Sequence, residues 1–220
     1  ILVASAAFGK KNNKLFFTPM KMFSLRWLDL NSADGQPKFY TINPDSYQLG
    51  DPNDEANHIT RMVIGADGYG YALTNDANHL YRITTGKQVT MTDLGNVVDD
   101  EANVNVSIKS RCTSWGGDMV ADAFGNLYVI TANHHIFVIN PATRIATHKG
   151  TIAGLPAMYT TNGAAVTENG DLMVASANMF DGYYLVKTAD WTATKIEGSD
   201  IQFNARSEEH TSELQSPYVI

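Results

Sequence analysis

The sequence has little of what several classes of protein need. Its 220 residues include one cysteine, Cys112, which excludes an internal disulfide. No run of about 18 uncharged apolar residues occurs, so no segment is predicted to span a membrane. Basic residues are also scarce: 16 Lys and Arg stand against 23 Asp and Glu, a net charge of −7. Because nucleic-acid binders neutralise phosphates with Lys and Arg, that class is excluded too.

Common catalytic and metal-binding motifs are missing as well. The sequence has no Gly-x-Ser-x-Gly, no Gly-Lys-Ser/Thr phosphate loop, no His-Glu-x-x-His and no Cys-x-x-Cys. The adjacent His134 and His135 would point to opposite faces of a strand, which favours a turn role over a shared metal. Acidic clusters at 51–55 and 93–101 hold oxygen ligands suited to calcium, but neither has the spacing of a calcium loop. We therefore predict no metal and no cofactor, with calcium as the alternative.

What the sequence does contain is a repeat of short apolar runs. Gly68, Gly125 and Gly170 lie 57 and 45 residues apart, each between two apolar runs. The Asp-Gly and Asn-Gly dipeptides at the first and third of these positions are typical of tight primed turns, so each pair of runs is predicted to form a β-hairpin. The hairpins span 62–74, 119–131 and 164–176; third strands are expected at 79–83, 135–139 and 183–187, and fourth strands at 88–94, 145–152 and 192–196.

Four strands per unit, at this spacing, predict an all-β fold of the β-propeller type. A degenerate earlier unit over 15–42 brings the expected total to about four four-stranded blades, the first incomplete. At roughly 50 residues per blade, a ring of six to eight blades needs about 300 to 400 residues. Residues 1–205 are therefore predicted to be part of a propeller ring.

The two ends of the chain have unusual sequences. Ile1 begins an apolar stretch without an initiator Met or a basic leader region, so the natural start is expected to lie upstream. Residues 206–216 read RSEEHTSELQS, which resembles a translated sequencing adapter. We therefore predict that 206–220 is a non-native read-through tail.

One phrase carries a family resemblance. The sequence VADAFGNLYV at 120–129, followed by IFVINPAT at 136–143, resembles the blade signature of bacterial β-propellers of the NHL, quinoprotein-like and lactonase-like group. The resemblance covers roughly residues 15–198 and implies the fold, because such phrases mark strands and turns. The Trp-Asp dipeptide of another propeller repeat is absent, since Gly116 follows Trp115. Resemblance to exported propellers, together with the low charge and the Asn- and Thr-rich turns, predicts an extracytoplasmic location.

Ligands of propellers usually meet the mouth of the central channel, at the loops that lead into the innermost strands. In this chain these loops are 57–61, 111–118 and 158–163, and they are rich in the Arg, Trp and Tyr side chains that binding sites favour. The alternative is that Asp118 and Asn162 cap turns and Trp115 packs between blades. The predicted ligand-binding residues are His58, Arg61, Arg111, Trp115, Asp118, Tyr159 and Asn162.

These observations predict a binding module that recognises a protein or glycan ligand through the channel-mouth loops. The alternative is a propeller enzyme, either a lactonase-like metal-dependent hydrolase or a quinoprotein-like oxidoreductase. A third interpretation is a structural repeat module within a larger surface protein. The enzyme would require acidic, Asn or His residues from several blades to converge on the channel, and the visible loops supply only His58, Asp118 and Asn162.

Overall fold

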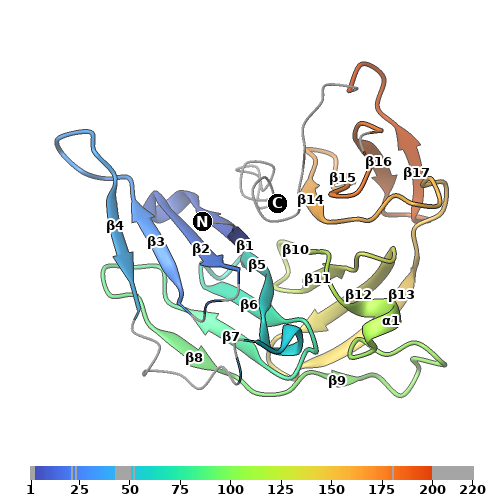
Figure 1. Ribbon diagram of the computed structural model, residues 1–220, viewed down its shortest axis with the longest axis horizontal. Helices are drawn as coiled ribbons and strands as arrows, with labels where there is room; N and C mark the ends of the chain where they lie inside the picture. Colours follow the sequence, from blue (N-terminus) through green and yellow to red (C-terminus); the bar gives the residue numbers. More distant parts are fainter. Residues whose placement is uncertain are drawn as a thin grey trace.

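In the residues that the structure describes, the chain forms four blades of an all-β propeller. The computed structural model describes residues 3–20, 22, 24–42, 51, 53–179 and 181–199, so the predicted tail at 206–220 lies outside it. Four sheets follow one another in chain order around a common centre (Figure 1). In the part of the chain described, no helix is long and apolar enough to cross a membrane.

Neighbouring strands within each blade are antiparallel. The first blade contains β1 (Val3–Gly9), β2 (Lys14–Pro19), β3 (Arg26–Asp29) and β4 (Lys38–Thr41). The second contains β5 (Ile59–Ile64), β6 (Gly70–Thr74), β7 (Leu80–Ile83) and β8 (Met91–Asp93). The third contains β10 (Asp118–Ala121), β11 (Leu127–Ile130), β12 (His135–Asn140) and β13 (Ile145–Thr151). The fourth contains β14 (Gly163–Val166), β15 (Leu172–Ala175), β16 (Tyr184–Lys187) and β17 (Thr192–Lys195).

The first blade has all four strands, so the prediction of an incomplete blade was wrong. The strand that the prediction lacked is β1, which pairs with β2 so that Ala7 lies opposite Phe16. Its hairpin lacks an Asp-Gly or Asn-Gly dipeptide. Instead the chain turns through the short 3₁₀ helix η1 (Lys10–Asn12) and through Asn13, whose φ of 49° is left-handed. Asn tolerates this conformation better than most residues, but it gives a weaker sequence signal than glycine.

The three glycine hairpins also differ in turn type from the prediction. In each, a backbone bond spans five residues, as from Gly65 N–H to the carbonyl of Tyr69 at 2.8 Å, and a glycine such as Gly68 has positive φ (81°). A single left-handed glycine at the end of a three-residue loop is the geometry of a type I turn with a bulge. The glycines were therefore placed correctly, but the turns are one residue longer than two-residue primed turns.

Hydrophobic cores lie between successive blades. The innermost strands β1, β5, β10 and β14 pack against one another in that order. One cluster joins the first two blades around Phe16 and Tyr81, a second joins the middle blades around Leu73 and Phe137, and a third joins the last two around Ile136. Each of the two middle blades therefore contributes one face to each of two cores, which explains why alternate residues of its strands face different neighbours.

Short parallel contacts join the rims of adjacent blades. β9 (Val98–Asp99), which follows the outermost strand of the second blade, runs parallel to β13 of the third. Val98 N–H donates to the carbonyl of Arg144 at 2.9 Å. At the next junction Ala153 forms a parallel bridge with Thr192, and its N–H donates to the carbonyl of Trp191 at 2.9 Å. The segment that leaves one blade therefore holds the outer strand of the next.

The two ends of the blades form two different faces. On one, turns between second and third strands bond to the loops that lead into the blades: Asn75 N–H donates to the His58 carbonyl, and the Thr131 hydroxyl donates to the Thr113 carbonyl, both at 3.0 Å. We call this the lead-in face. The opposite end carries the turns between first and second strands, at 65–69, 122–126 and 167–171, and we call it the hairpin face.

Candidate functional site

Arg61, one of the predicted ligand-binding residues, is completely buried at a junction between blades. From β5 its Nε donates to the carbonyl of Gly116 at 3.0 Å, and its Nη2 donates to the same oxygen and to the carbonyl of Ser114. Burial lowers the pKa of Arg61 to about 10, an effect opposed by the charge of Asp118. The guanidinium thus fixes the lead-in loop of the third blade to the second blade.

Asp118 and Tyr159 are buried as well, at the junction of the third and fourth blades. The Asp118 carboxylate accepts the N–H of Ala164, from β14, at 2.8 Å. The Tyr159 hydroxyl lies 3.0 Å from the carbonyl oxygen of Val174 and 2.9 Å from that of Gly182. Burial raises the pKa of Tyr159, so the phenol stays protonated and able to donate. These polar groups are occupied within the protein.

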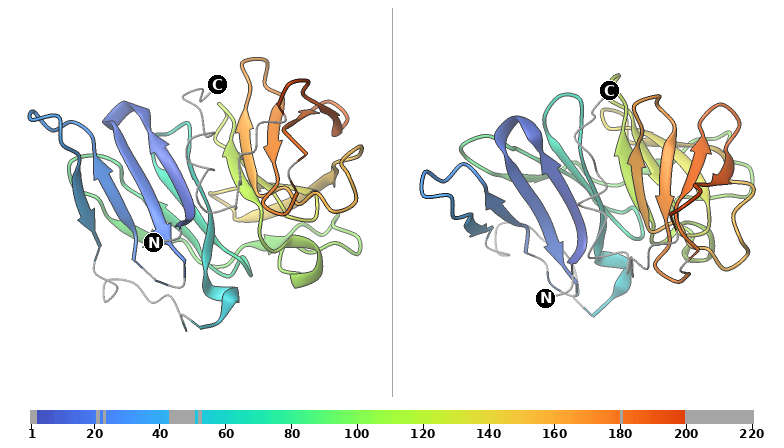
Figure 2. Two further views of the ribbon diagram at one scale, coloured as in Figure 1. Left: turned by 45° about the horizontal axis from the view of Figure 1, so that its top comes forward. Right: turned by 90° about the horizontal axis from the view of Figure 1, so that it is seen from above.

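Arg111 and Trp115 form a separate cluster on the lead-in face, where Arg111 is exposed and Trp115 is half-buried. Arg111 begins the short helix α1 (Arg111–Ser114), and its guanidinium lies 5.2 Å from the centre of the Trp115 ring. It also lies 3.2 Å from the Glu55 carboxylate, with side chains 73% and 66% exposed. Glu55 belongs to η3 (Glu55–Asn57), which lies beside α1 (Figure 2, left). The cluster of Glu55, Arg111 and Trp115 therefore bridges the lead-in loops of two blades, and we call it the Arg–Trp patch.

The Trp115 ring is held at its edge as well as contacted on its face. Its indole N–H donates to the carbonyl of Lys109 at 3.2 Å, so the ring has one orientation with Arg111 on its face. An arginine over an aromatic ring is attracted by the ring quadrupole. The patch is therefore largely ordered before any partner arrives, which lowers the entropy lost on binding.

His58 and Asn162 have turn roles on the same face, and both are half-buried. His58 ends η3, with its N–H donating to the Glu55 carbonyl at 3.2 Å. The Asn162 side chain accepts the N–H of Ala177 at 3.1 Å. The structure thus groups Arg111 and Trp115 with Glu55, and it places Arg61, Asp118 and Tyr159 between blades. Ligand binding by the full set of seven stays a prediction.

The adjacent histidines have different partners: the His134 ring contacts the Tyr159 carbonyl, and the His135 ring contacts His148. His134 has a left-handed φ of 72° in the turn, whereas the Nδ1 of His135 lies 3.2 Å from the Nε2 of His148. In the second blade the equivalent pair is His79 and Asp93, at 2.7 Å. Burial is the largest cause that lowers the pKa of both His135 and His148, and the neighbouring charge of His148 lowers that of His135 further.

The carboxylates of the acidic clusters accept hydrogen bonds from backbone N–H groups of their own loops. Asp99 accepts the N–H of Ile108 at 2.9 Å, and Asp51 accepts the N–H of Asn53 at 2.8 Å. Within the described ranges, no group of three or more His, Cys, Asp or Glu side chains is arranged to hold a metal ion.

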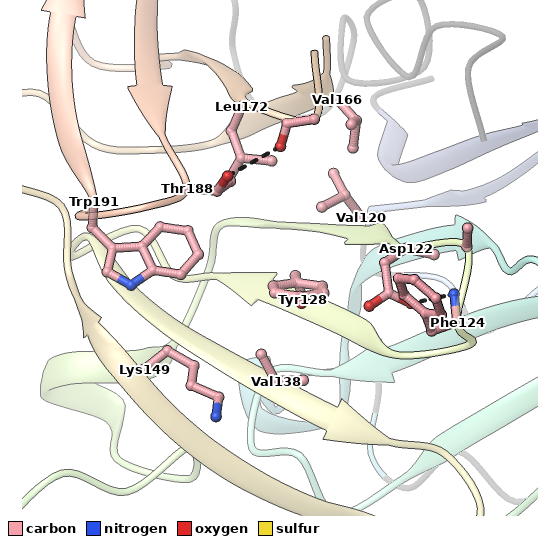
Figure 3. Close-up of a pocket in the computed structure, with 13 residues that line it drawn as sticks. Val120, Asp122, Phe124, Tyr128, Val138, Lys149, Val166, Leu172, Thr188 and Trp191 are labelled. Atoms are coloured by element: carbon pink, nitrogen blue, oxygen red, sulfur yellow. Dashed lines mark hydrogen bonds between the residues drawn. The ribbon is translucent and has the colours of Figure 1, made fainter. Parts of the chain in front are cut away.

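A cavity of about 440 Å³ lies on the hairpin face, between the third and fourth blades (Figure 3). None of the seven predicted ligand-binding residues lines it. Its walls include Tyr128, Lys149 and Trp191, which sequence reasoning did not select. The available signal was Trp191 itself, an aromatic residue in a turn where the third blade has Arg144.

Comparisons with known proteins support the fold. No family model and no curated protein matches the chain. Solved structures do: virginiamycin B lyase from Staphylococcus aureus shares 14% identity over 90% of this chain, with a TM-score of 0.52. A gluconolactonase from Xanthomonas campestris shares 10% identity over 88% of this chain, with a TM-score of 0.53. The chain spans 57% and 61% of these two proteins. At this identity the likeness shows a β-propeller fold and nothing finer.

Proposed function

We propose that this chain is a binding module of an extracytoplasmic protein, which recognises a protein or glycan partner through its lead-in face. The observation that carries the proposal is the Arg–Trp patch. Arg and Trp are the residue types most often found at the energetic centres of interfaces. Here Arg111 is exposed and Trp115 is half-buried; both come from the lead-in loop of the third blade, where Lys109 fixes the indole and Glu55, from the loop of the second blade, contacts the guanidinium.

The patch can recognise a partner in two complementary ways. The Trp115 ring offers a flat apolar surface for a side chain or a sugar ring, and the Arg111 guanidinium offers directional N–H donors for carboxylates or hydroxyls. Glu55 accepts one of those donors in the free protein, so an acidic group on a partner would compete for the same guanidinium.

A library screen with matched variants tests this proposal. The chain is screened against a glycan array and a peptide-display library, and the affinity of each hit is measured for wild type, Arg111→Ala and Arg82→Ala. Arg82 is the control because it also stacks on an aromatic ring, with its guanidinium 5.0 Å from the centre of the Tyr69 ring. Arg111→Ala should weaken the hits about tenfold or more, as expected for an interface centre. Hits that bind both variants as they bind wild type would overturn the proposal.

A further inference from the structure

The cavity on the hairpin face has one continuous apolar wall across the third blade. Val120, Tyr128 and Val138 are direct cross-strand partners on β10, β11 and β12, so their side chains form a row on the same face of the sheet. Leu172 of the fourth blade faces this row across the cavity (Figure 3). The core that these two blades share also includes Ile136, beyond the cavity.

At the preceding junction, between the second and third blades, side chains occupy the equivalent space. In the second blade the equivalent row begins with Val63 and Tyr71, which are 8% and 5% exposed and belong to the core shared with the third blade. Leu94 packs against that core from the strand end, just before Gly95. In the third blade, the equivalent residue before Gly150 is Lys149, the extra residue of a bulge between β12 and β13. The exposed Lys149 thus stands where the preceding junction has Leu94, which packs against the core.

Trp191 covers the cavity at the side of Lys149. Its backbone is left-handed, with a φ of 57°, a conformation that costs free energy for a bulky residue. The ring lies directly over Gly150: a Cβ on that glycine would approach the indole Cδ1 to 3.0 Å. At the preceding junction the equivalent residue is Arg144, also left-handed with a φ of 58°. Trp191 and Lys149 thus both line this end of the cavity (Figure 3).

The chemistry of the walls restricts the ligand. Valine and leucine offer no hydrogen bonds, so the body of the ligand must be apolar, and Tyr128 and Trp191 favour a flat aromatic ring. Lys149 is the one cation among the residues that line the cavity. The lining also includes an acid, Asp122, at the opposite end from Lys149, and its carboxylate accepts the N–H groups of Phe124 and Asn126, both at 2.9 Å.

We propose that this cavity binds a small aromatic carboxylate, with its ring between Tyr128 and Trp191 and its acid group on Lys149. The volume of about 440 Å³ lies within the range of small-molecule sites. The site lies at the other end of the blades from the Arg–Trp patch and is independent of the proposed function.

Calorimetric titration of the 220-residue chain with 2-naphthoate, and with the uncharged 2-naphthalenemethanol, tests the site. Wild type should bind the carboxylate at least about tenfold more tightly than the alcohol, because a hydrogen bond to a charged group is stronger than a neutral one. Lys149→Leu, which copies Leu94, should remove that preference. Lys87→Leu, on an exposed lysine of the second blade outside the cavity, should keep it.

Because Lys149 is exposed, Lys149→Leu should leave the fold intact, and circular dichroism checks this. Trp191→Gly, which removes the indole and relieves the left-handed backbone, should weaken both ligands. The proposal is overturned if wild type binds neither ligand, or if folded Lys149→Leu binds 2-naphthoate as tightly as wild type.

Discussion

At the scale of single residues, the junctions between blades are held by buried polar groups as well as by apolar cores. Arg61 bonds to the third blade, the Asp118 carboxylate bonds to the fourth, and the Thr18 hydroxyl of the first blade donates to the Ile59 carbonyl of the second at 3.1 Å. Each bond satisfies a backbone group on a neighbouring blade. The cost of leaving a buried carbonyl or N–H unpaired therefore favours one relative position of the blades.

Arg61 gives the clearest stability prediction. Arg61→Met removes the guanidinium and leaves the buried carbonyls of Ser114 and Gly116 without that donor, so the free energy of unfolding should fall by about 3 to 5 kcal/mol. Arg82→Met is the control, since Arg82 is exposed and should cost no more than about 1 kcal/mol. Urea denaturation measures both. Equal losses in the two variants would show that Arg61 does not hold the junction.

The histidine pair of the third blade predicts a dependence on pH. The pKa values of His135 and His148 are lowered in the folded protein, mainly by burial. As the pH falls through about 6.5, the ordinary pKa of histidine, the unfolded chain therefore takes up protons first and the folded state loses stability. Above that pH both states are neutral at these sites and this loss disappears.

His148→Asp tests this directly, because it copies the pair of His79 and Asp93 in the second blade. A carboxylate beside His135 favours the charged imidazole, so the loss of stability between about pH 7.5 and 5.5 should become smaller or reverse. Urea midpoints at the two pH values measure the change. If the variant and wild type lose the same stability on acidification, this histidine pair does not cause the loss.

At the scale of secondary structure, the sequence was most informative where turns have a strong signal. Gly68, Gly125 and Gly170 located three hairpins, and the runs around them became β5 to β7, β10 to β12 and β14 to β16. β1 was missed because its turn relies on Asn13. The parallel contacts of β9 and Ala153 were not predictable either, because their partners belong to the next blade.

These rim contacts predict slow amide exchange outside the blades. The N–H groups of Val98 and Ala153 donate to carbonyls of the next blade, each at 2.9 Å. Their hydrogen exchange should therefore be slowed about as much as that of strand amides, and much more than that of the exposed turn residue Ala123. Native-state exchange followed by NMR measures this. Exchange of Val98 and Ala153 as fast as that of Ala123 would mean that the blades are not joined at their rims.

At the scale of the whole molecule, the two faces have different chemistry. The lead-in face carries the Arg–Trp patch, where the exposed charges of Arg111 and Glu55, from two blades, lie beside the half-buried ring of Trp115. The hairpin face carries a recessed apolar cavity with a lysine at one end. From its residue types, the sequence indicated the first face as a candidate recognition surface, and ligand binding there stays a prediction. The sequence alone could not predict which of these residues would be exposed. Arg61 and Arg111 are the same residue type in two lead-in loops, and the packing of neighbouring blades buries Arg61 but leaves Arg111 exposed.

The central claim, that the lead-in face is the recognition surface, is tested most directly by fluorescence. Cys112 is the single cysteine of the chain, is exposed, and lies in α1 beside Arg111, so an environment-sensitive dye can be attached at one known place. Titration with a ligand selected from the glycan or peptide libraries should give a saturable change in dye emission, which Trp115→Ala reduces. Binding detected by calorimetry without any change in the emission of the dye at Cys112 would contradict the claim.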